Sequence, residues 1–300
     1  MKKEIGYIGL GKMGFNMVER LLEKGHAVTA YNRSPEAVER IVAQGAKGAE
    51  SVGALASALP APRLIWLMVP HQAVDDVLTE LAPHVQAGDT IIDGGNSPYV
   101  DSMRRGRELA EKGVVFLDAG ISGGPAGARD GACVMVGGVQ ERYEEFKELF
   151  ADISAPDAYG YMGTSGAGHF TKMVHNGIEY GMMQAIAEGF EVLKKAEFGI
   201  SLKEAARVYN NRSVIESRLV GWLVAAYGEY GENLDAISGE VAATGEGLWT
   251  VEAAKRLSVP TPIIEGSVHF RDQSKGNPSY TGQVLSALRN QFGGHEAKAK

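Results

Sequence analysis

The sequence predicts an α/β protein in which a doubly wound sheet domain is followed by an all-helical domain. In the first half of its 300 residues, apolar strand-like runs alternate with helical stretches, which is typical of a parallel sheet covered on both faces. After about residue 160 the strand-like runs end and long helical patterns follow. We therefore place the sheet domain at residues 1–162 and the helical domain at residues 163–300.

Six short apolar runs are expected to form the sheet, because continuous apolar strands indicate burial on both faces. They are residues 5–10, 27–32, 64–69, 90–95, 114–119 and 132–138. Helical patterns lie between several of them, at residues 13–24, 35–44, 71–82, 99–112 and 139–150. The helical domain is expected to contain helices near 166–197, 202–211, 214–229 and 250–257.

The composition is that of an ordinary globular protein, with 44% hydrophobic and 22% charged residues and a net charge of −7. This charge disfavours nucleic acid as a main partner. No apolar run approaches the ~20 residues of a membrane span, and the N-terminus lacks a signal-peptide pattern, so we expect a cytoplasmic protein without a membrane partner. The single cysteine, Cys133, excludes disulfides within the chain and is expected to be a buried strand residue.

A glycine-rich turn follows the first apolar run, with Gly9, Gly11 and Gly14 in the spacing of a dinucleotide-binding site. The first glycine permits a tight turn, the second lets a pyrophosphate approach the backbone, and the third lets helix and strand pack closely. Because the motif lies between a strand and an amphipathic helix, it favours a Rossmann-type cofactor site over a turn without a ligand. Met13 and Val69 are expected to contact the same cofactor.

The end of the second run bears on which dinucleotide binds. An NAD site usually has a carboxylate there for the ribose hydroxyl, whereas this chain has Asn32, Arg33 and Ser34. A guanidinium suits a 2′-phosphate, so we expect NADP over NAD. In the alternative interpretation, Arg33 is a solvated loop residue and Ser34 merely caps the helix that starts at Pro35.

A polar stripe begins the first helix of the helical domain. Its members share one helical face, and they are Lys172, His175, Asn176 and Glu179. The same face then becomes apolar, at Met183, Ile186 and Phe190. A solvent-exposed face would stay polar, so the change favours a buried wall lining a polar pocket, with a mixed surface stripe as the alternative.

The residue types of this stripe suit acid–base chemistry. A lysine in a dry pocket has a lowered pKa and can act as a base. In the same pocket the pKa of a glutamate can be raised, so that it can act as an acid. Environments that separate two pKa values in this way define acid and base roles. Lys172 and Glu179 are therefore the candidate catalytic pair.

Two further glycine motifs, DGGNS (93–97) and SGGPAGARDG (122–131), follow predicted strands. The carboxyl ends of parallel strands are where open α/β sheets bind ligands. Asn96 could bridge cofactor and substrate, and Ser122 with the amides of Gly123 and Gly124 could hold a carboxylate. The alternative is that both motifs are simple turns.

These motifs, and above all GAGHFTKMVHNGIEYG, resemble the short form of the decarboxylating 6-phosphogluconate dehydrogenase family, within the β-hydroxyacid dehydrogenase superfamily. The resemblance covers most of the chain. It implies that Lys172 takes the proton of the C3 hydroxyl while hydride passes to the nicotinamide. The 3-keto acid then loses carbon dioxide, and Glu179 protonates C1 of the enediol to give ribulose 5-phosphate of the pentose phosphate pathway, without a metal.

The resemblance also implies the residues that contact the sugar-phosphate substrate: Asn96, Ser122, Gly123, Gly124, His175, Asn176, Tyr180, Arg271, Arg289 and His295. Tyr180 and Arg271 match phosphate contacts. Arg289 and His295 belong to a C-terminal tail that, in the family, reaches the neighbouring subunit's site, so a homodimer or larger homo-oligomer is expected. The alternative for this tail is a plain terminal helix ending at Gly293 and Gly294.

Three positions depart from the longer family members, which carry a lysine and a threonine where this chain has Thr244 and Glu246, and commonly a lysine at Pro70. One anion contact is lost and a carboxylate appears beside the substrate phosphate. The alternative activity is an NADP-linked β-hydroxyacid dehydrogenase or reductase that does not decarboxylate. A non-catalytic NADP-binding regulatory protein is a third alternative, which Lys172 and Glu179 argue against.

Overall fold

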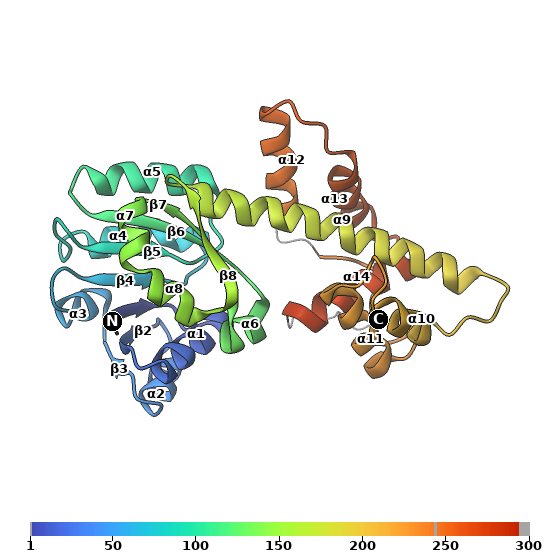
Figure 1. The fold of residues 1–300 in the computed structure, drawn as a ribbon, viewed down its shortest axis with the longest axis horizontal. Coiled ribbons are helices and arrows are strands. Elements are labelled where there is room, and N and C mark those ends of the chain that lie inside the picture. The colour runs from blue at the N-terminus through green and yellow to red at the C-terminus, as the bar shows by residue number, and fades with distance from the viewer. Residues whose placement is uncertain (1, 243–244, 294–300) are drawn as a thin grey trace. The chain divides into compact units, whose positions relative to one another are not determined.

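An eight-stranded sheet organises the first half of the chain in the computed structural model, which describes residues 2–242 and 245–293 (Figure 1). The strands lie in the order β3-β2-β1-β4-β5-β6-β7-β8. Their bounds are β1 (Glu4–Ile8), β2 (Ala27–Tyr31), β3 (Lys47–Gly48), β4 (Leu64–Leu67), β5 (Thr90–Asp93), β6 (Val115–Ser122), β7 (Ala132–Gly138) and β8 (Ser154–Gly163). The sheet belongs to the first of two compact units, Met1–Lys172 and Met173–Lys300.

The first six strands are parallel and reverse their order between β1 and β4, which confirms the predicted doubly wound sheet. The expectation of a parallel sheet is wrong for β7, which runs antiparallel to β6. Only the short helix α6 (Gly124–Asp130) joins these two strands. A parallel neighbour needs a crossover of about a dozen residues or more, so the chain turns back instead.

Helices of the first unit follow the predicted pattern with a few additions. They are α1 (Lys12–Glu23), α2 (Pro35–Val42), α3 (Val52–Ser57), η1 (His71–Ala73), α4 (Val74–Leu81), α5 (Tyr99–Ala110), α7 (Gln140–Glu145) and α8 (Lys147–Ile153). The helix predicted at 139–150 is divided at Phe146. Strands β3 and β8 and helices α3 and α6 were not predicted, because short or proline- and glycine-containing segments depend on their neighbours for stability.

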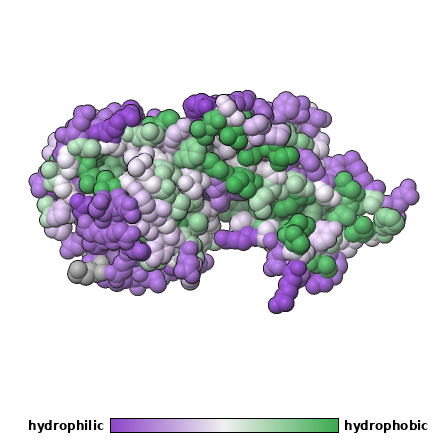
Figure 2. Space-filling model, turned by 45° about the horizontal axis from the view of Figure 1, so that its top comes forward, coloured by the Kyte–Doolittle hydropathy of each residue, from purple (hydrophilic) through white to green (hydrophobic). Residues whose placement is uncertain are grey.

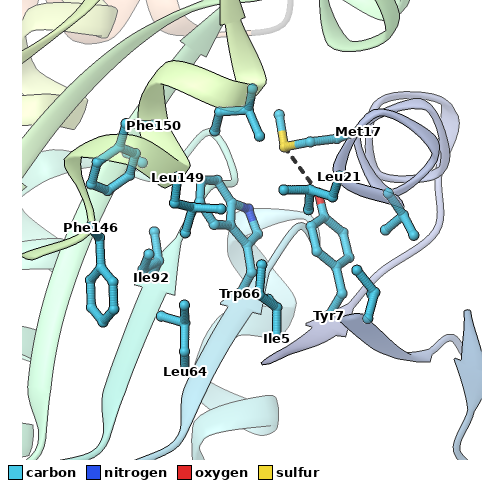
Figure 3. Close-up of a cluster of buried hydrophobic side chains, with 14 of the residues drawn as sticks. Ile5, Tyr7, Met17, Leu21, Leu64, Trp66, Ile92, Phe146, Leu149 and Phe150 are labelled. Atoms are coloured by element: carbon cyan, nitrogen blue, oxygen red, sulfur yellow. Dashed lines mark hydrogen bonds between the residues drawn. The ribbon is translucent and has the colours of Figure 1, made fainter. Parts of the chain in front are cut away.

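The core explains why these strands read as continuous apolar runs. On one face of the sheet, Tyr7 and Trp66 stack with ring centroids 6.2 Å apart, and the Tyr7 hydroxyl donates to the sulfur of Met17, at 3.3 Å (Figure 3). Burial raises the pKa of Tyr7. On the other face, Ile65 and Leu67 belong to a second cluster with helices α3, α4 and α5. Both faces are covered, as in other doubly wound sheets.

Cys133 lies in strand β7, as predicted, but its side chain is exposed rather than buried. The pairing of β7 with β8 shifts register between Ala132 and Val134, so Cys133 occupies an irregularity in the ladder. The two steps from Ala132 to Val134 face five steps in β8, from Ser154 to Tyr159, so the extra residues of β8 disrupt the pairing beside Cys133.

The second unit contains only helices among its described residues, and the prediction of an all-helical second domain is confirmed. Helix α9 (Ala167–Lys195) begins in the first unit and continues here, followed by α10 (Leu202–Tyr209), α11 (Arg218–Tyr230), α12 (Glu246–Arg256), α13 (Pro262–Gln273) and α14 (Tyr280–Gly293). Helix α13 was not predicted, since its β-branched residues and Gly266 have low helix propensity. Over the part of the chain described here, no helix is long and apolar enough to cross a membrane.

Helix α14 supplies much of the core of this unit. Val284, Leu285, Ala287 and Leu288 are fully buried in the cluster that also includes residues of α9, α10 and α11. Arg289 follows Leu288 and is also buried, so a charged side chain lies inside this unit. Such a charge requires compensation, which makes Arg289 a candidate for a ligand contact.

Candidate active site

The carboxyl edge of the sheet carries the predicted cofactor and substrate residues of the first unit. Gly9, Asn32, Val69 and Asn96 follow β1, β2, β4 and β5, and Ser122 ends β6. Because these strands are parallel neighbours, their ends meet at one edge of the sheet. The topological switch between β1 and β4 lies at the centre of this edge, where doubly wound sheets bind their ligands.

The glycine turn has the geometry that a dinucleotide requires. Gly9 has a φ of +105°, and a Cβ there would lie 2.3 Å from the Met68 carbonyl oxygen. A Cβ at Gly14 would lie 2.1 Å from the Gly9 oxygen, so this glycine lets α1 pack on β1. A Cβ at Gly11 would meet no atom within 4 Å, which leaves the backbone at the start of α1 open to a phosphate group. The residues present therefore fit a dinucleotide.

Asn32 connects the end of β2 to this turn. Its Oδ1 accepts a hydrogen bond from the Leu10 amide, at 2.9 Å, and its Nδ2 donates to Ser34 Oγ, also at 2.9 Å. Ser34 occupies the N-cap position of α2 but makes no capping hydrogen bond, so the interpretation that it merely caps that helix is wrong. Arg33 is exposed between them, directly after the end of β2.

The loop that carries Asn96 is held by a buried carboxylate. Asp93 Oδ1 accepts from the Gly95 amide at 3.0 Å, and Oδ2 accepts from Ser97 Oγ at 2.8 Å. The DGGNS motif was predicted to contribute Asn96, and its aspartate and serine organise the turn. Asn96 is thereby presented at the edge by hydrogen bonds within its own motif.

Arg105 of α5 connects the loop after β5, which carries Asn96, to the loop after β4, which carries Val69. Its Nη1 lies 3.2 Å from Ser97 Oγ and 3.5 Å from Asp93 Oδ2, and its Nη2 donates to the His71 carbonyl at 3.2 Å. Its Nε donates to Asp75 Oδ1, at 2.9 Å. Hydrogen bonds from Arg105, assisted by Arg104, lower the pKa of Asp75 to about 2. One buried guanidinium thus fixes the loops that bear Val69 and Asn96.

Lys172 is 8% exposed and lies in the second turn of α9, in the first unit. A Cβ at Gly120 of β6 would lie 2.3 Å from the Cβ of Lys172, so the stem of the lysine occupies the space above that glycine. Gly120 and Ser122 share a face of β6, because strand residues two apart point the same way. Ser122 therefore faces the same side of the sheet as the candidate base.

The rest of the polar stripe continues along α9 in the second unit. His175, Asn176 and Glu179 are partly buried, and His175 Nδ1 lies 3.0 Å from Asn176 Oδ1 and 3.9 Å from Glu179 Oε2. The predicted apolar continuation is fully buried at Met183 and nearly so at Phe190, at 2% exposure. A stripe wholly exposed to solvent does not fit this burial, least of all at Lys172.

Arg271 of α13 is the most unusual charged group of the second unit. It is 2% exposed, its guanidinium carbon lies 3.4 Å from the centroid of the Tyr180 ring, and its Nη2 lies 3.8 Å from the sulfur of Met183. Its Nε and Nη1 have no hydrogen-bond partner among the described residues. Burial lowers the pKa of Arg271 to about 10.

A second cation lies close by, since Arg289 of α14 contributes to lowering the pKa of Arg271. Burial lowers the pKa of Arg289 too, while the charges of Tyr180, Glu246 and Glu179 act in the opposite direction. Two buried guanidiniums, of which Arg271 has two open donor nitrogens, form a site suited to a multiply charged anion. The structure therefore brings together Tyr180, Arg271 and Arg289, which the sequence had placed far apart along the chain.

Glu246, the first residue of α12, is 8% exposed and acts electrostatically on both arginines. The carboxylate noted in the sequence thus belongs to the cationic cluster. Thr244 and His295 lie outside the described residues. Pro70 precedes the short helix η1 as its N-cap. Within residues 2–242 and 245–293, no group of three or more histidine, cysteine, aspartate or glutamate side chains is arranged to hold a metal ion.

Comparisons with known proteins agree with this arrangement over both units. Residues 4–193 match the family described as the NAD binding domain of 6-phosphogluconate dehydrogenase. Residues 168–284 match the 6-phosphogluconate dehydrogenase C-terminal domain. The two matches overlap in α9, the helix that carries the polar stripe.

Individual relatives cover the whole chain. A Bacillus subtilis (strain 168) protein named only provisionally as a 6-phosphogluconate dehydrogenase, YqeC, is 46% identical over 297 residues, covering 99% of this chain and all of that one. The NAD(+)-dependent, decarboxylating 6-phosphogluconate dehydrogenase of Haloferax volcanii is 42% identical and is covered to 99%. The Haemophilus influenzae enzyme is 40% identical, and the match covers 64% of its length.

Solved structures show the same fold. Plasmodium falciparum 6-phosphogluconate dehydrogenase, determined apo, with NADP+ and with 6-phosphogluconate, superposes with a TM-score of 0.81 at 30% identity, over 96% of this chain and 70% of that one. Mycobacterium tuberculosis 3-hydroxyisobutyrate dehydrogenase, at 19% identity and a TM-score of 0.77, shares the fold. With both domains matched and full-length relatives above 40% identity, this chain belongs to the 6-phosphogluconate dehydrogenase family, in its short form.

Proposed function

We propose that this protein oxidises and decarboxylates 6-phosphogluconate to ribulose 5-phosphate and carbon dioxide, with reduction of NADP. The observation that carries the proposal is Arg271, a buried guanidinium with two open donor nitrogens, beside Tyr180 and Arg289. A buried cation without a hydrogen-bonded carboxylate is costly unless a ligand compensates it. A phosphate would accept from these donors, and the decarboxylating names of several relatives support the same substrate.

In the proposed reaction Lys172 removes the proton of the C3 hydroxyl. Its side chain is only 8% exposed, so the proton would be transferred in a site largely shielded from water. A nicotinamide dinucleotide bound at the glycine turn would accept the hydride leaving C3. Asn96, Ser122 and the amides of Gly123 and Gly124 would hold the substrate's hydroxyls and carboxylate, which fixes the reacting carbon relative to the base.

Oxidation at C3 gives a β-keto acid, whose C1–C2 bond breaks to release carbon dioxide and leave an enediol. Glu179 would then protonate C2 of the former substrate, which becomes C1 of ribulose 5-phosphate. It lies on the same face of α9 as Lys172. His175 and Asn176, one turn after Lys172 in the same stripe, would bind substrate hydroxyls. These steps need no metal, which remains our prediction for this enzyme.

For the cofactor we propose NADP as the better-bound dinucleotide. Arg33 is exposed between Asn32 and Ser34, and no carboxylate occupies the position that would accept from a ribose hydroxyl. The name of the Haloferax volcanii relative makes NAD the alternative, and that of another Bacillus subtilis relative, NADP(+)-dependent and 39% identical, supports NADP.

The experiment that tests the proposed reaction measures carbon dioxide release and NADP or NAD reduction, side by side, with 6-phosphogluconate and with unphosphorylated gluconate. We expect stoichiometric carbon dioxide and reduced cofactor with the phosphorylated acid, and far weaker turnover without the phosphate. Reduction of the cofactor without carbon dioxide would support the alternative of a non-decarboxylating β-hydroxyacid dehydrogenase. No turnover with either cofactor would overturn both.

We further propose that the protein is a homodimer or larger homo-oligomer, with the C-terminal tail near a neighbouring site. Helix α9 presents an exposed stripe at seven-residue spacing, whose members are Ile178, Met182, Ala185, Gly189 and Val192. Ile263 of α13 is exposed beside it, and Figure 2 shows hydrophobic surface on the helical unit. Apolar and small residues at this spacing suit a helix of a second copy.

A further inference from the structure

Asp118 is a carboxylate buried inside an apolar strand. It lies in β6 at 0% exposure. Its Oδ1 accepts from the Gly166 amide at 2.7 Å, and its Oδ2 accepts from the His169 amide at 2.8 Å. These amides belong to the start of α9, where backbone donors have no partner within the helix. Asp118 therefore caps the helix that carries Lys172, from outside that helix.

The helix start lies directly on the sheet backbone at this point. A Cβ at Gly168 would lie 2.5 Å from the carbonyl oxygens of Asp118 and Met135, and a Cβ at Gly137 would lie 2.6 Å from the Gly168 amide. Neither position can accept a side chain without moving the helix. The hydrogen bonds of Asp118 thus act across a contact that has no room for adjustment.

The same strand face also holds the lysine. Asp118 and Gly120 are two residues apart in β6 and point the same way. A Cβ at Gly120 would lie 2.3 Å from the Lys172 Cβ and 3.1 Å from its Cγ. On this face of β6, Asp118 therefore binds the start of α9, and Gly120 leaves space for the Lys172 side chain.

Helix α5 fixes the rotation of α9 from another side. Ser102 Oγ lies 2.7 Å from His169 Nδ1, and Tyr99 packs edge-on against Phe170, with centroids 5.0 Å apart. His169 and Phe170 directly precede the turn that contains Lys172. Contacts with both β6 and α5 therefore hold this turn of the helix.

We propose that Asp118 and Gly120 are positioning residues that set the location of the Lys172 amine for proton removal. The proposal rests on the proposed function, in which Lys172 is the base. Neither residue is expected to contact the substrate; both act through the start of α9. Loss of either should lower the rate of the chemical step and leave cofactor binding at the distant glycine turn unchanged.

The test compares Asp118→Asn with Asp89→Asn as a matched control. Asp89 is also 0% exposed and also accepts backbone hydrogen bonds, from the amides of Arg63 at 2.6 Å and Gln86 at 2.9 Å, but it precedes β5 at the opposite edge of the sheet. Steady-state kinetics with 6-phosphogluconate, the isotope effect with C3-deuterated substrate, and amide hydrogen exchange over residues 164–173 are measured for each.

For Asp118→Asn we expect kcat to fall about 10- to 100-fold, as misplacement of a catalytic group by about 1 Å does, with the KM for the cofactor changed less than about twofold. The isotope effect should rise, and exchange over 164–173 should accelerate. Asp89→Asn should retain kcat and the wild-type exchange of that segment. Equal losses of kcat in both variants, or wild-type kcat and exchange in Asp118→Asn, would overturn the proposal.

A second variant keeps the inference testable if Asp118→Asn does not fold. Gly120→Ala leaves the carboxylate of Asp118 in place but puts a methyl group into the space that the Lys172 side chain occupies. We expect the same fall in kcat and the same rise in the isotope effect. Wild-type kinetics in Gly120→Ala would contradict the proposal. Hydrogen exchange separates this inference from the proposed function, because accelerated exchange in Asp118→Asn is expected even if wild-type protein does not turn over 6-phosphogluconate.

Discussion

The central carbon of the Arg271 guanidinium lies over the ring of Tyr180, 3.4 Å from the ring centroid. Helix α12 also packs against the ring, since a Cβ at Gly247 would lie 2.5 Å from it. Stacking of this kind satisfies the face of a guanidinium and leaves its edge nitrogens for a ligand. Two of those nitrogens have no protein partner among the described residues.

Replacement of Arg271 by methionine should separate phosphate recognition from catalysis. A charge-assisted hydrogen bond is worth about 1.5–3 kcal/mol, so loss of two should raise the KM for 6-phosphogluconate by about 100-fold or more. Turnover of unphosphorylated gluconate should change little. Arg207→Met, at an exposed arginine paired with Glu204, is the control and should leave both substrates unaffected. Equal losses with both substrates would contradict a phosphate contact.

The pKa of Arg271 gives this variant a stability signature as well. Its value of about 10 lies below the ordinary one, so burial disfavours the charged form and the charge destabilises the fold at every pH below about 10. That penalty fades only as the pH rises through 10 toward the ordinary value. At pH 7 the ligand-free Arg271→Met protein should therefore unfold at the wild-type temperature or above it, as scanning calorimetry can measure. A markedly lower unfolding temperature would show that Arg271 stabilises the empty protein.

Glu246→Gln should strengthen binding of the phosphorylated substrate. Glu246 is buried and its charge opposes that of a bound phosphate while it supports both arginines. Removing one nearby negative charge is worth about 1 kcal/mol, so the KM should fall roughly fivefold. The empty protein should lose stability, because two buried cations then lack their carboxylate. A higher KM would instead show that Glu246 orients the arginines.

Lys172→Met should remove the base while preserving the helix. General base catalysis contributes about 10²–10⁴-fold, so kcat should fall by a factor in that range, with cofactor binding measured by fluorescence unchanged. Lys195→Met lies on the same helix at an exposed position paired with Glu191, and it should retain full activity. Similar activity in the two variants would exclude Lys172 as the base.

Arg33→Ala should change the choice of cofactor and little else. Its guanidinium is proposed to meet the 2′-phosphate, so the KM for NADP should rise by about tenfold or more while that for NAD changes less than about twofold. Arg33→Asp should favour NAD further, because a carboxylate accepts from the ribose hydroxyl and repels the phosphate. Equal effects of either variant on both cofactors would contradict the assignment.

Met182→Glu and Ile263→Glu test the proposed oligomer. Both side chains are exposed on the helical unit, and a carboxylate in a helix-to-helix contact would be desolvated on association. Sedimentation velocity should show a dimer or larger species for the wild type and a shift toward monomer in each variant. Val42→Glu, at an exposed position of α2 in the first unit, is the control and should assemble normally. A wild-type monomer would contradict the proposal.

Several features could be read from local pattern because the physics that produces them is local. The glycine spacing at Gly9, Gly11 and Gly14 requires only a strand, a turn and a helix in succession. The stripe from Lys172 to Phe190 follows from helical period alone, and its change from polar to apolar predicted burial that the structure confirms at Met183. Strands with continuous apolar character predicted a sheet covered on both faces.

Features that depend on non-local partners were missed or wrong. The direction of β7 follows from a connection too short for a crossover, and the exposure of Cys133 follows from an irregularity in its pairing with β8. Asp118 left one signal in the sequence, a single carboxylate within an apolar run, which marks a buried polar group that must have partners. Those partners lie 48 and 51 residues further along the chain.

Sequence alone was sufficient for the order of the two domains, the cofactor turn and the stripe that carries the proposed base and acid, since each is encoded within one or two elements. Only the tertiary structure decided that Arg271 and Arg289 are buried near each other around Tyr180, and that Asp118 and Gly120 hold the start of α9. Burial and the partners of a charge are properties of surfaces that meet on folding, and residues distant in sequence acquire them only when the chain brings those surfaces together.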